Sequence, residues 1–263
     1  MCVVVLISAC QSVRTTEPGV VGVGREQHMS PLVSEADLRR GATNAYRGII
    51  EEATKKGQLN RDNAEVVRVH AIVRQIVGQS GAFRADTSDW PWEVNVITAP
   101  EVNAWCMPGG KIAIYSGFMD RIKPTDAELA AVIGHEVAHA LREHARERAS
   151  QAITQGLLLD VIGRVAGVGA GAMDLTQLAL QVTLNLPNSR EHEDEADRMG
   201  VELAARAGFD PRAAVTLWQK MTAIGGKGGP EFLSTHPSGA NRQRDVSAYA
   251  QRVLPLYEAA RKQ

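Results

Sequence analysis

The sequence predicts an α+β fold that is mostly helical and carries one small β-sheet. Hydrophobic residues recur at helical spacing along much of the chain, and a Thr-x-x-Glu capping box at Thr125 marks one helix start. Alternating or β-branched residues over 92–97 and 111–115, separated by a Pro-Gly-Gly turn at 108–110, predict strands. The chain has 263 residues, of which 44% are hydrophobic, which suits one large domain with extensions.

Composition excludes several classes of protein. The net charge of −1 and the lack of a Lys/Arg-rich run argue against a nucleic-acid partner. The three cysteines form no CxxC pair, so a thiolate zinc site is not expected. A chain of this length can bury its own core, so a disulfide framework is not expected either.

The N-terminal residues resemble the end of a bacterial lipoprotein signal. A short apolar run ends in Ile7-Ser8-Ala9-Cys10, which matches the lipobox pattern with Cys10 as the lipidated residue, although no basic segment precedes it. The other interpretation is a frayed apolar tail. The run is too short to span a bilayer, which takes about 20 apolar residues. Because Gln11 follows the cysteine, the expected location is the periplasmic side of the outer membrane, with the chain held by a lipid anchor.

The pattern divides the chain into three parts. Residues 1–10 are the signal remnant, 11–31 are polar with scattered Pro and Gly and are expected to be a flexible tether, and 32–263 form the domain. Helices are predicted over 35–56, 62–77, 125–150, 157–184 with interruptions, 189–207, 211–224 and 242–262.

A metal-binding motif stands inside the capped helix, where the chain reads His135-Glu136-Val137-Ala138-His139. Four residues are about one helical turn, so both imidazoles project from one face and can share a single zinc ion. Glu136 can reach the open coordination position and take a proton from the bound water. Apolar neighbours predict that this helix is buried, and a buried His-Glu-His cluster without a metal would cost much free energy.

A catalytic zinc needs a third protein ligand, and the acidic segment 189–197 offers candidates. Glu193 would complete a His-His-Glu site, and Asp197, one turn later, would accept the N–H of a ligating histidine. Taken alone, such a segment is typical of a solvated helix face. Glu191 and Glu195 compete with Glu193, and spacing does not separate the three.

Four blocks together resemble the HtpX/Ste-type zinc metallopeptidases, peptidase family M48, and above all their soluble bacterial lipoprotein members of the LoiP and YcaL type. The blocks are NAWCMPGG at 103–110, the HExxH helix at 128–139, the acidic segment at 189–197, and Thr-His-Pro at 235–237 followed by Arg242. They occur in the family order. The resemblance implies a gluzincin-type metallopeptidase domain with one Zn²⁺ per chain.

The resemblance also implies roles for single residues. The third zinc ligand falls on Glu193. His236 is expected near the active site, where it stabilises the tetrahedral oxyanion or gates the metal, although a plain loop turn is the other interpretation. Arg242 is expected to orient structure around an acidic residue. His144 is expected to turn away from the metal face, since it lies five residues past His139.

Substrate is expected at the strand that follows the turn Pro108-Gly109-Gly110. The edge of this strand, with Ile112 and Ala113, would border the cleft and pair with an extended chain through backbone hydrogen bonds. Such pairing reads the main chain and therefore suits unfolded protein.

The predicted function is that of a zinc metalloendopeptidase, a hydrolase that cuts unfolded or misassembled cell-envelope proteins in quality control. The alternative is a periplasmic chaperone-like binder of unfolded proteins with latent protease activity; a purely structural metal is a third hypothesis. The apolar segment 157–173, with glycines at four-residue steps, is expected to be a helical hairpin beside the active site or a lid that touches a membrane.

Overall fold

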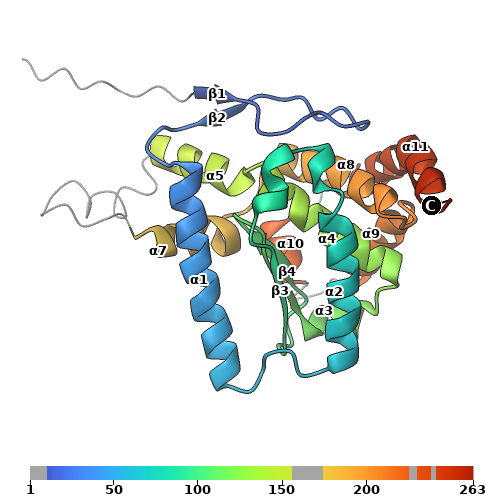
Figure 1. Ribbon diagram of the computed structural model, residues 1–263, viewed down its shortest axis with the longest axis horizontal. Helices are drawn as coiled ribbons and strands as arrows, with labels where there is room; N and C mark the ends of the chain where they lie inside the picture. Colours follow the sequence, from blue (N-terminus) through green and yellow to red (C-terminus); the bar gives the residue numbers. More distant parts are fainter. Residues whose placement is uncertain (1–10, 156–173, 225–229, 238–240, 263) are drawn as a thin grey trace, which may run out of the picture.

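The computed structural model describes residues 11–155, 174–224, 230–237 and 241–262, and within them the predicted mostly helical α+β architecture is confirmed (Figure 1). The strands are β1 (Gln11–Val13), β2 (Gln27–Met29), β3 (Glu93–Ile97), β4 (Ala104–Met107) and β5 (Lys111–Tyr115). The longer helices are α1 (Glu35–Lys55), α2 (Asn63–Val77), α4 (Asp126–Leu141), α5 (His144–Thr154), α8 (Arg190–Arg206), α9 (Ala213–Ala223) and α11 (Arg242–Ala260). Shorter elements are η1 (Ser80–Ala82), η2 (Ala85–Asp89), α3 (Ser116–Ile122), α7 (Leu175–Leu180), the π-helical turn η3 (Gln181–Asn185) and α10 (Phe232–Thr235).

Two predicted segments fall outside the described residues. They are the lipoprotein signal with Cys10 and the glycine-rich apolar stretch at 157–173. Within the described ranges, none of the helices combines the length and the hydropathy that a membrane crossing requires.

The three-stranded sheet has the order β3-β5-β4, with β5 parallel to β3 and antiparallel to β4. Both sides of β5 are therefore already paired, so the prediction that substrate pairs with the edge at Ile112 and Ala113 is wrong. Among the described strands, β4 is the edge strand of this sheet on the side that packs against α4. The prediction failed because the sequence indicated strands over 92–97 and 111–115 but not β4, which pairs with the second side of β5.

The helix predicted over 125–150 is two helices. The capping box at Thr125 is present and α4 begins as predicted, but α4 ends at Leu141 and α5 begins at His144. Glu143, between them, has a φ of 52°, in the left-handed region that side-chain-bearing residues seldom adopt. Its carboxylate receives hydrogen bonds from Arg84 at 2.7 Å and Arg146 at 3.0 Å, which hold this conformation.

The flexible tether predicted over 11–31 is wrong. The hairpin β1–β2 and the loop between its strands pack on the domain, with β2 against α5, and Val21, Val23 and Met29 are buried (Figure 1). The backbone N–H of Val21 donates to Glu202 on α8 at 2.9 Å. The folded part of the described chain thus begins at residue 11 rather than 32, because buried apolar side chains and the ion pairs of Arg25 with Glu147 and Glu195 hold the segment on the domain.

Helices α4 and α8 cross at two glycines. A Cβ on Gly200 would lie 2.7 Å from the backbone N of His135, and a Cβ on Gly134 would lie 2.7 Å from the carbonyl O of Gly200. Neither distance is compatible with a side chain, so the two backbones can touch only because both residues are glycine. The crossing brings the HExxH motif of α4 against the acidic first half of α8.

We expect Gly200→Ala to lower the free energy of unfolding by about 1–3 kcal/mol, because the added methyl group forces two packed backbones apart. The same separation should reduce zinc content. Gly48→Ala is the matched control: Gly48 is exposed on α1 with open space around its Cα, and alanine there should raise stability by about 0.5–1 kcal/mol. Urea denaturation and zinc analysis of both variants measure this, and a Gly200→Ala protein as stable as wild type would contradict it.

Candidate metal centre

Three of the predicted metal ligands meet at the crossing of α4 and α8. The Nε2 atoms of His135 and His139 lie 3.0 Å apart, and the carboxylate of Glu193 lies 3.5 Å from the first and 3.3 Å from the second. Ligands at about 2.0–2.1 Å from a tetrahedral zinc ion lie roughly 3.3 Å from one another. All three side chains are buried, so the donor set and its spacing fit a zinc ion.

Glu193 is separated from its two competitors by position. Glu191 lies on the exposed side of α8, with 62% of its side chain accessible. Glu195 is buried but faces away from the two Nε2 atoms, toward His144. Only Glu193 of the three therefore joins the histidines.

His236, in the segment after α10, joins the same cluster. Its Nδ1 lies 3.2 Å from Nε2 of His135 and 3.0 Å from Glu193, and its Nε2 lies 3.5 Å from Oε1 of Glu136. Among the described residues, these two histidines of α4, Glu193 and His236 offer four ligand atoms within 4.8 Å of one another. The ring of Phe232 stacks on His236 with 4.1 Å between centroids, which fixes its plane.

The far side of His135 is held by the predicted partner. Its Nδ1 donates to Asp197 at 2.9 Å, which leaves Nε2 for the metal. Arg242 donates to both oxygens of Asp197 at 2.7 and 2.9 Å and forms an ion pair with Glu193 at 2.9 Å. Its guanidinium also lies 3.5 Å from the ring centroid of Trp218. Arg242 thus orients the acidic pair, as the sequence predicted.

Burial and charge set the protonation of the cluster. Burial lowers the pKa of His139 well below its ordinary value, so its imidazole is neutral, the form that ligates metals. At His135 burial also opposes the charged form, but the hydrogen bonds with Asp197 and Glu193 outweigh it and raise the pKa to about 9. The carboxylates of Asp197 and Glu193 therefore favour a positive charge between the ligand-type atoms, and a bound dication would provide it.

Glu136 lies beside the ligand atoms without being one of them. Burial raises the pKa of its carboxyl above the ordinary value, while the nearby His236 and His135 work in the opposite direction. Its Oε1 is buried and finds no hydrogen-bond partner within the described residues, although Nε2 of His236 lies 3.5 Å away. A carboxyl with a raised pKa and a free oxygen is suited to exchange a proton with a bound molecule.

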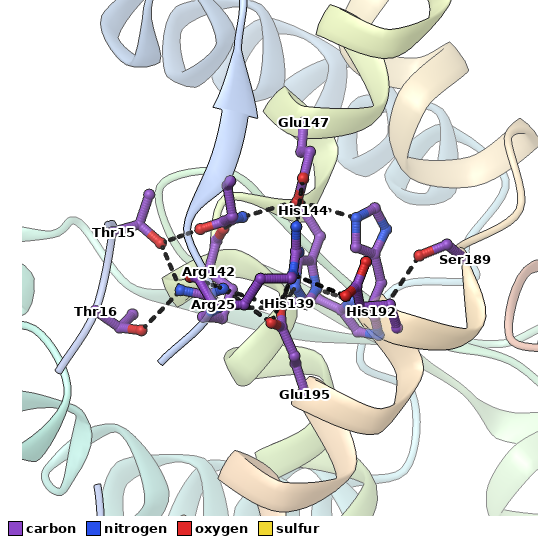
Figure 2. A network of polar contacts seen from close by, with 12 residues as sticks. Thr15, Thr16, Arg25, His139, Arg142, His144, Glu147, Ser189, His192 and Glu195 are labelled. Atoms are coloured by element: carbon purple, nitrogen blue, oxygen red, sulfur yellow. Dashed lines mark hydrogen bonds and ion pairs between the residues drawn. The ribbon is translucent and has the colours of Figure 1, made fainter. Parts of the chain in front are cut away.

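His139, the second histidine of the motif, has a support that the sequence did not predict (Figure 2). Nδ1 of His139 lies 2.8 Å from Nδ1 of His144, and Nε2 of His144 lies 2.9 Å from Glu195. A neutral His139 that ligates through Nε2 carries its proton on Nδ1 and donates it to His144, which in turn donates from Nε2 to Glu195. The prediction that His144 turns away is wrong, because the helix break at Glu143 redirects it. Neither glycine nor proline marks this break.

Two arginines hold the far end of this chain of hydrogen bonds (Figure 2). Arg142, fully buried, donates to both oxygens of Glu195 at 3.0–3.2 Å. Arg25, from the N-terminal segment, donates to Glu195 at 2.8 Å and to both oxygens of Glu147 at 2.7 and 2.8 Å. Glu147 in turn contacts Nε2 of His192 at 3.0 Å. Arg25, in the segment predicted as a tether, thus holds Glu195 in place behind His144 and His139.

The predicted substrate-binding turn lies beside the centre only in part. Pro108 and Gly109 line a cavity together with His139. Gly110 instead packs under Trp92, where a Cβ would lie 2.5 Å from the indole ring. A second cavity, lined by the edge strand β4, opens onto Glu136 and His236.

The family model described as Peptidase family M48 matches residues 63–250. Mitochondrial metalloendopeptidase OMA1 of Arabidopsis thaliana is 41% identical over 153 residues, which cover 58% of this chain and 30% of that protein. Its Schizosaccharomyces pombe counterpart is 35% identical over 213 residues, covering 80% and 60%. The Beta-barrel assembly-enhancing protease of Escherichia coli K12 is 28% identical over 189 residues, covering 68% and 39%. The aligned part of this chain spans between 30% and 60% of these relatives' lengths.

We expect Arg25→Met to weaken zinc binding by about 10-fold, because Glu195 then orients His144, and through it His139, less firmly. Arg14→Met is the matched control, since Arg14 is an exposed residue of the same segment. Arg25→Lys should retain part of the affinity. Competition with a chromogenic chelator measures the zinc Kd, and equal Kd values for Arg25→Met and wild type would disprove the link.

Proposed function

The chain belongs to peptidase family M48, and we propose that it is a zinc-dependent endopeptidase that hydrolyses internal peptide bonds. The observation that carries this proposal is the buried Oε1 of Glu136, which accepts no hydrogen bond from any described residue and lies beside the ligand-type atoms of His135, His139 and Glu193. Family members are zinc-dependent, and the spacing of the donor set fits that ion.

The roles of the side chains follow from this placement. A bound zinc ion would polarise the scissile carbonyl and lower the pKa of the attacking water. Glu136 accepts a proton from that water while the water oxygen bonds to the carbonyl carbon. It delivers the proton to the amine as the C–N bond breaks. His236 faces the same space and stabilises the negative charge that develops on the carbonyl oxygen.

The proposed substrates are unfolded or misassembled proteins of the cell envelope. The edge strand β4 borders the cavity at Glu136, where an extended chain could add to the sheet through main-chain hydrogen bonds. One relative is named for an effect on β-barrel assembly. The lipobox ending at Cys10 supports a lipid anchor and a place on the periplasmic side of the outer membrane.

A chaperone-like binder with latent protease activity is the second candidate, and one observation favours it. His236 lies among the ligand atoms, with its Nδ1 3.0 Å from Glu193 and 3.2 Å from His135. A zinc ion with four protein ligands resembles a closed structural site, whereas catalysis needs an open position. Whether His236 acts on substrate or on the metal decides between the two candidates.

Glu136→Gln should reduce cleavage of an unfolded model protein by about 10²–10⁴-fold, because the amide cannot accept the proton of the attacking water. Zinc content should stay at one ion per chain, since Glu136 is not a ligand. Gel-based cleavage assays and metal analysis on the purified full chain check both points. Wild-type protein that holds zinc and does not cut would refute the proposed activity.

His236→Ala should lower kcat by about 10²–10³-fold with zinc content unchanged, as expected for the loss of a group that stabilises the oxyanion. The measurement compares steady-state rates on the same substrate and zinc stoichiometry. An increase in rate would show instead that His236 holds the enzyme latent, which favours the second candidate.

A further inference from the structure

The cavity that opens onto Glu136 collects polar atoms that lack partners. It lies between β4 and η3, and five of its lining residues each have a buried side-chain atom that finds no hydrogen-bond partner among the described residues. These atoms are Nε1 of Trp105, Oε1 of Glu136, Nη1 of Arg148, Oγ1 of Thr183 and Oδ1 of Asn188. Buried polar groups are almost always hydrogen-bonded, so their convergence on one cavity indicates a place for a polar ligand.

Arg148 is the unusual member of this group. It comes from α5, is only 7% exposed, and its Nε and Nη2 both donate to the carbonyl oxygen of Val182, at 2.9 and 2.5 Å. Within the described part of the chain its guanidinium forms no ion pair, whereas Arg142 and Arg242 each contact a carboxylate directly. Burial of this guanidinium is costly, because the carboxylates of Glu193, Glu136 and Glu147 act on it only from a distance and offset its desolvation in part.

Position relates Arg148 to the reacting bond. Arg148 and Thr183 line the cavity at Glu136 and also the neighbouring cavity at Pro108, and His139 borders both. The guanidinium therefore lies between the two cavities, beside the metal centre. A substrate residue that flanks the scissile bond would pass close to Nη1.

The local charge favours an acidic ligand. Glu193 and Glu136 would together balance the charge of a bound dication, and Glu147 is paired with Arg25, so Arg148 is the positive charge of the cavity wall that no carboxylate contacts among the described residues. Nη1 can donate to one oxygen of a carboxylate and the hydroxyl of Thr183 to the other, while Oδ1 of Asn188 is free to accept a substrate backbone N–H.

We propose that Arg148, with Thr183 and Asn188, forms a substrate subsite that selects an acidic side chain, Asp or Glu, next to the scissile bond. This proposal rests on the proposed endopeptidase function. It makes Arg148 a specificity-determining residue.

The test uses pairs of quenched fluorescent peptides that differ only by Glu or Gln at one position flanking the scissile bond. For wild type we expect kcat/KM to be at least about tenfold higher for the Glu peptide at one such position. Arg148→Met, which keeps the apolar stem, should reduce this ratio to about 1 and leave the Gln peptide within about threefold of wild type. Arg148→Lys should keep part of the preference, since it keeps the charge.

Arg47→Met is the matched control, because it removes the same charge from an exposed position on α1, outside the lining of both cavities. It should leave the Glu/Gln ratio unchanged. Loss of the preference in Arg47→Met but not in Arg148→Met would overturn the assignment. So would wild-type cleavage with no Glu/Gln difference, the result expected if Nη1 binds only water or a backbone carbonyl. An equal fall for both peptides in Arg148→Met would show a merely structural role.

Binding separates this proposal from the proposed function. Fluorescence anisotropy measures the Kd of the same peptides for zinc-loaded Glu136→Gln, with and without Arg148→Met. If the Glu peptide binds more tightly than the Gln peptide and the difference requires Arg148, the subsite is supported. If the wild type at the same time does not cut, the endopeptidase function is refuted while the subsite stands. Equal binding of the two peptides refutes the subsite whether or not wild type cuts.

Discussion

The contact between two glycine backbones, Gly134 on α4 and Gly200 on α8, is the constraint on which the rest of this structure depends. Only at that separation do His135 and His139 from one helix come within about 3.5 Å of Glu193 from the other. The same approach removes both helices from water. Every charged group near the crossing must then find a partner inside the protein, because an unpaired buried charge costs several kcal/mol.

Two chains of hydrogen bonds provide those partners, one behind each metal-binding histidine. Asp197 and Arg242 stand behind the first, and His144, Glu195 and two arginines stand behind the second. In both chains the imidazole proton of the histidine lies on Nδ1, so its Nε2 is left free to face the shared site. The second chain extends to Arg25, which explains why the N-terminal segment is folded: its conformation completes the charge balance of α5 and α8.

Local signals predicted most of the elements and the two histidines of the motif, whereas the choice of Glu193 came from the family resemblance. The capping box at Thr125 predicted a helix start, and the four-residue spacings on α4 and α8 predicted which side chains share a face. The failures share a cause. The break at Glu143 and the burial of residues 11–31 depend on ion pairs between residues far apart in sequence. The order of the strands likewise depends on pairing between segments that are distant in sequence. Propensity carries no information about such contacts.

The buried charged side chains of this molecule fall into two groups, those in ion pairs with a carboxylate and those that line the cavity at Glu136. Arg25, Arg142 and Arg242 all contact carboxylates, and these pairs orient the side chains around the cluster of His135, His139 and Glu193. Glu136 and Arg148 are as deeply buried and line one cavity. Among the described residues Arg148 forms no ion pair, and Glu136 is paired only with the imidazole of His236, at 3.5 Å. The fold thus holds two charges of opposite sign that contact no side chain of permanent opposite charge. Glu136 can accept a proton, and Arg148 can bind an anion.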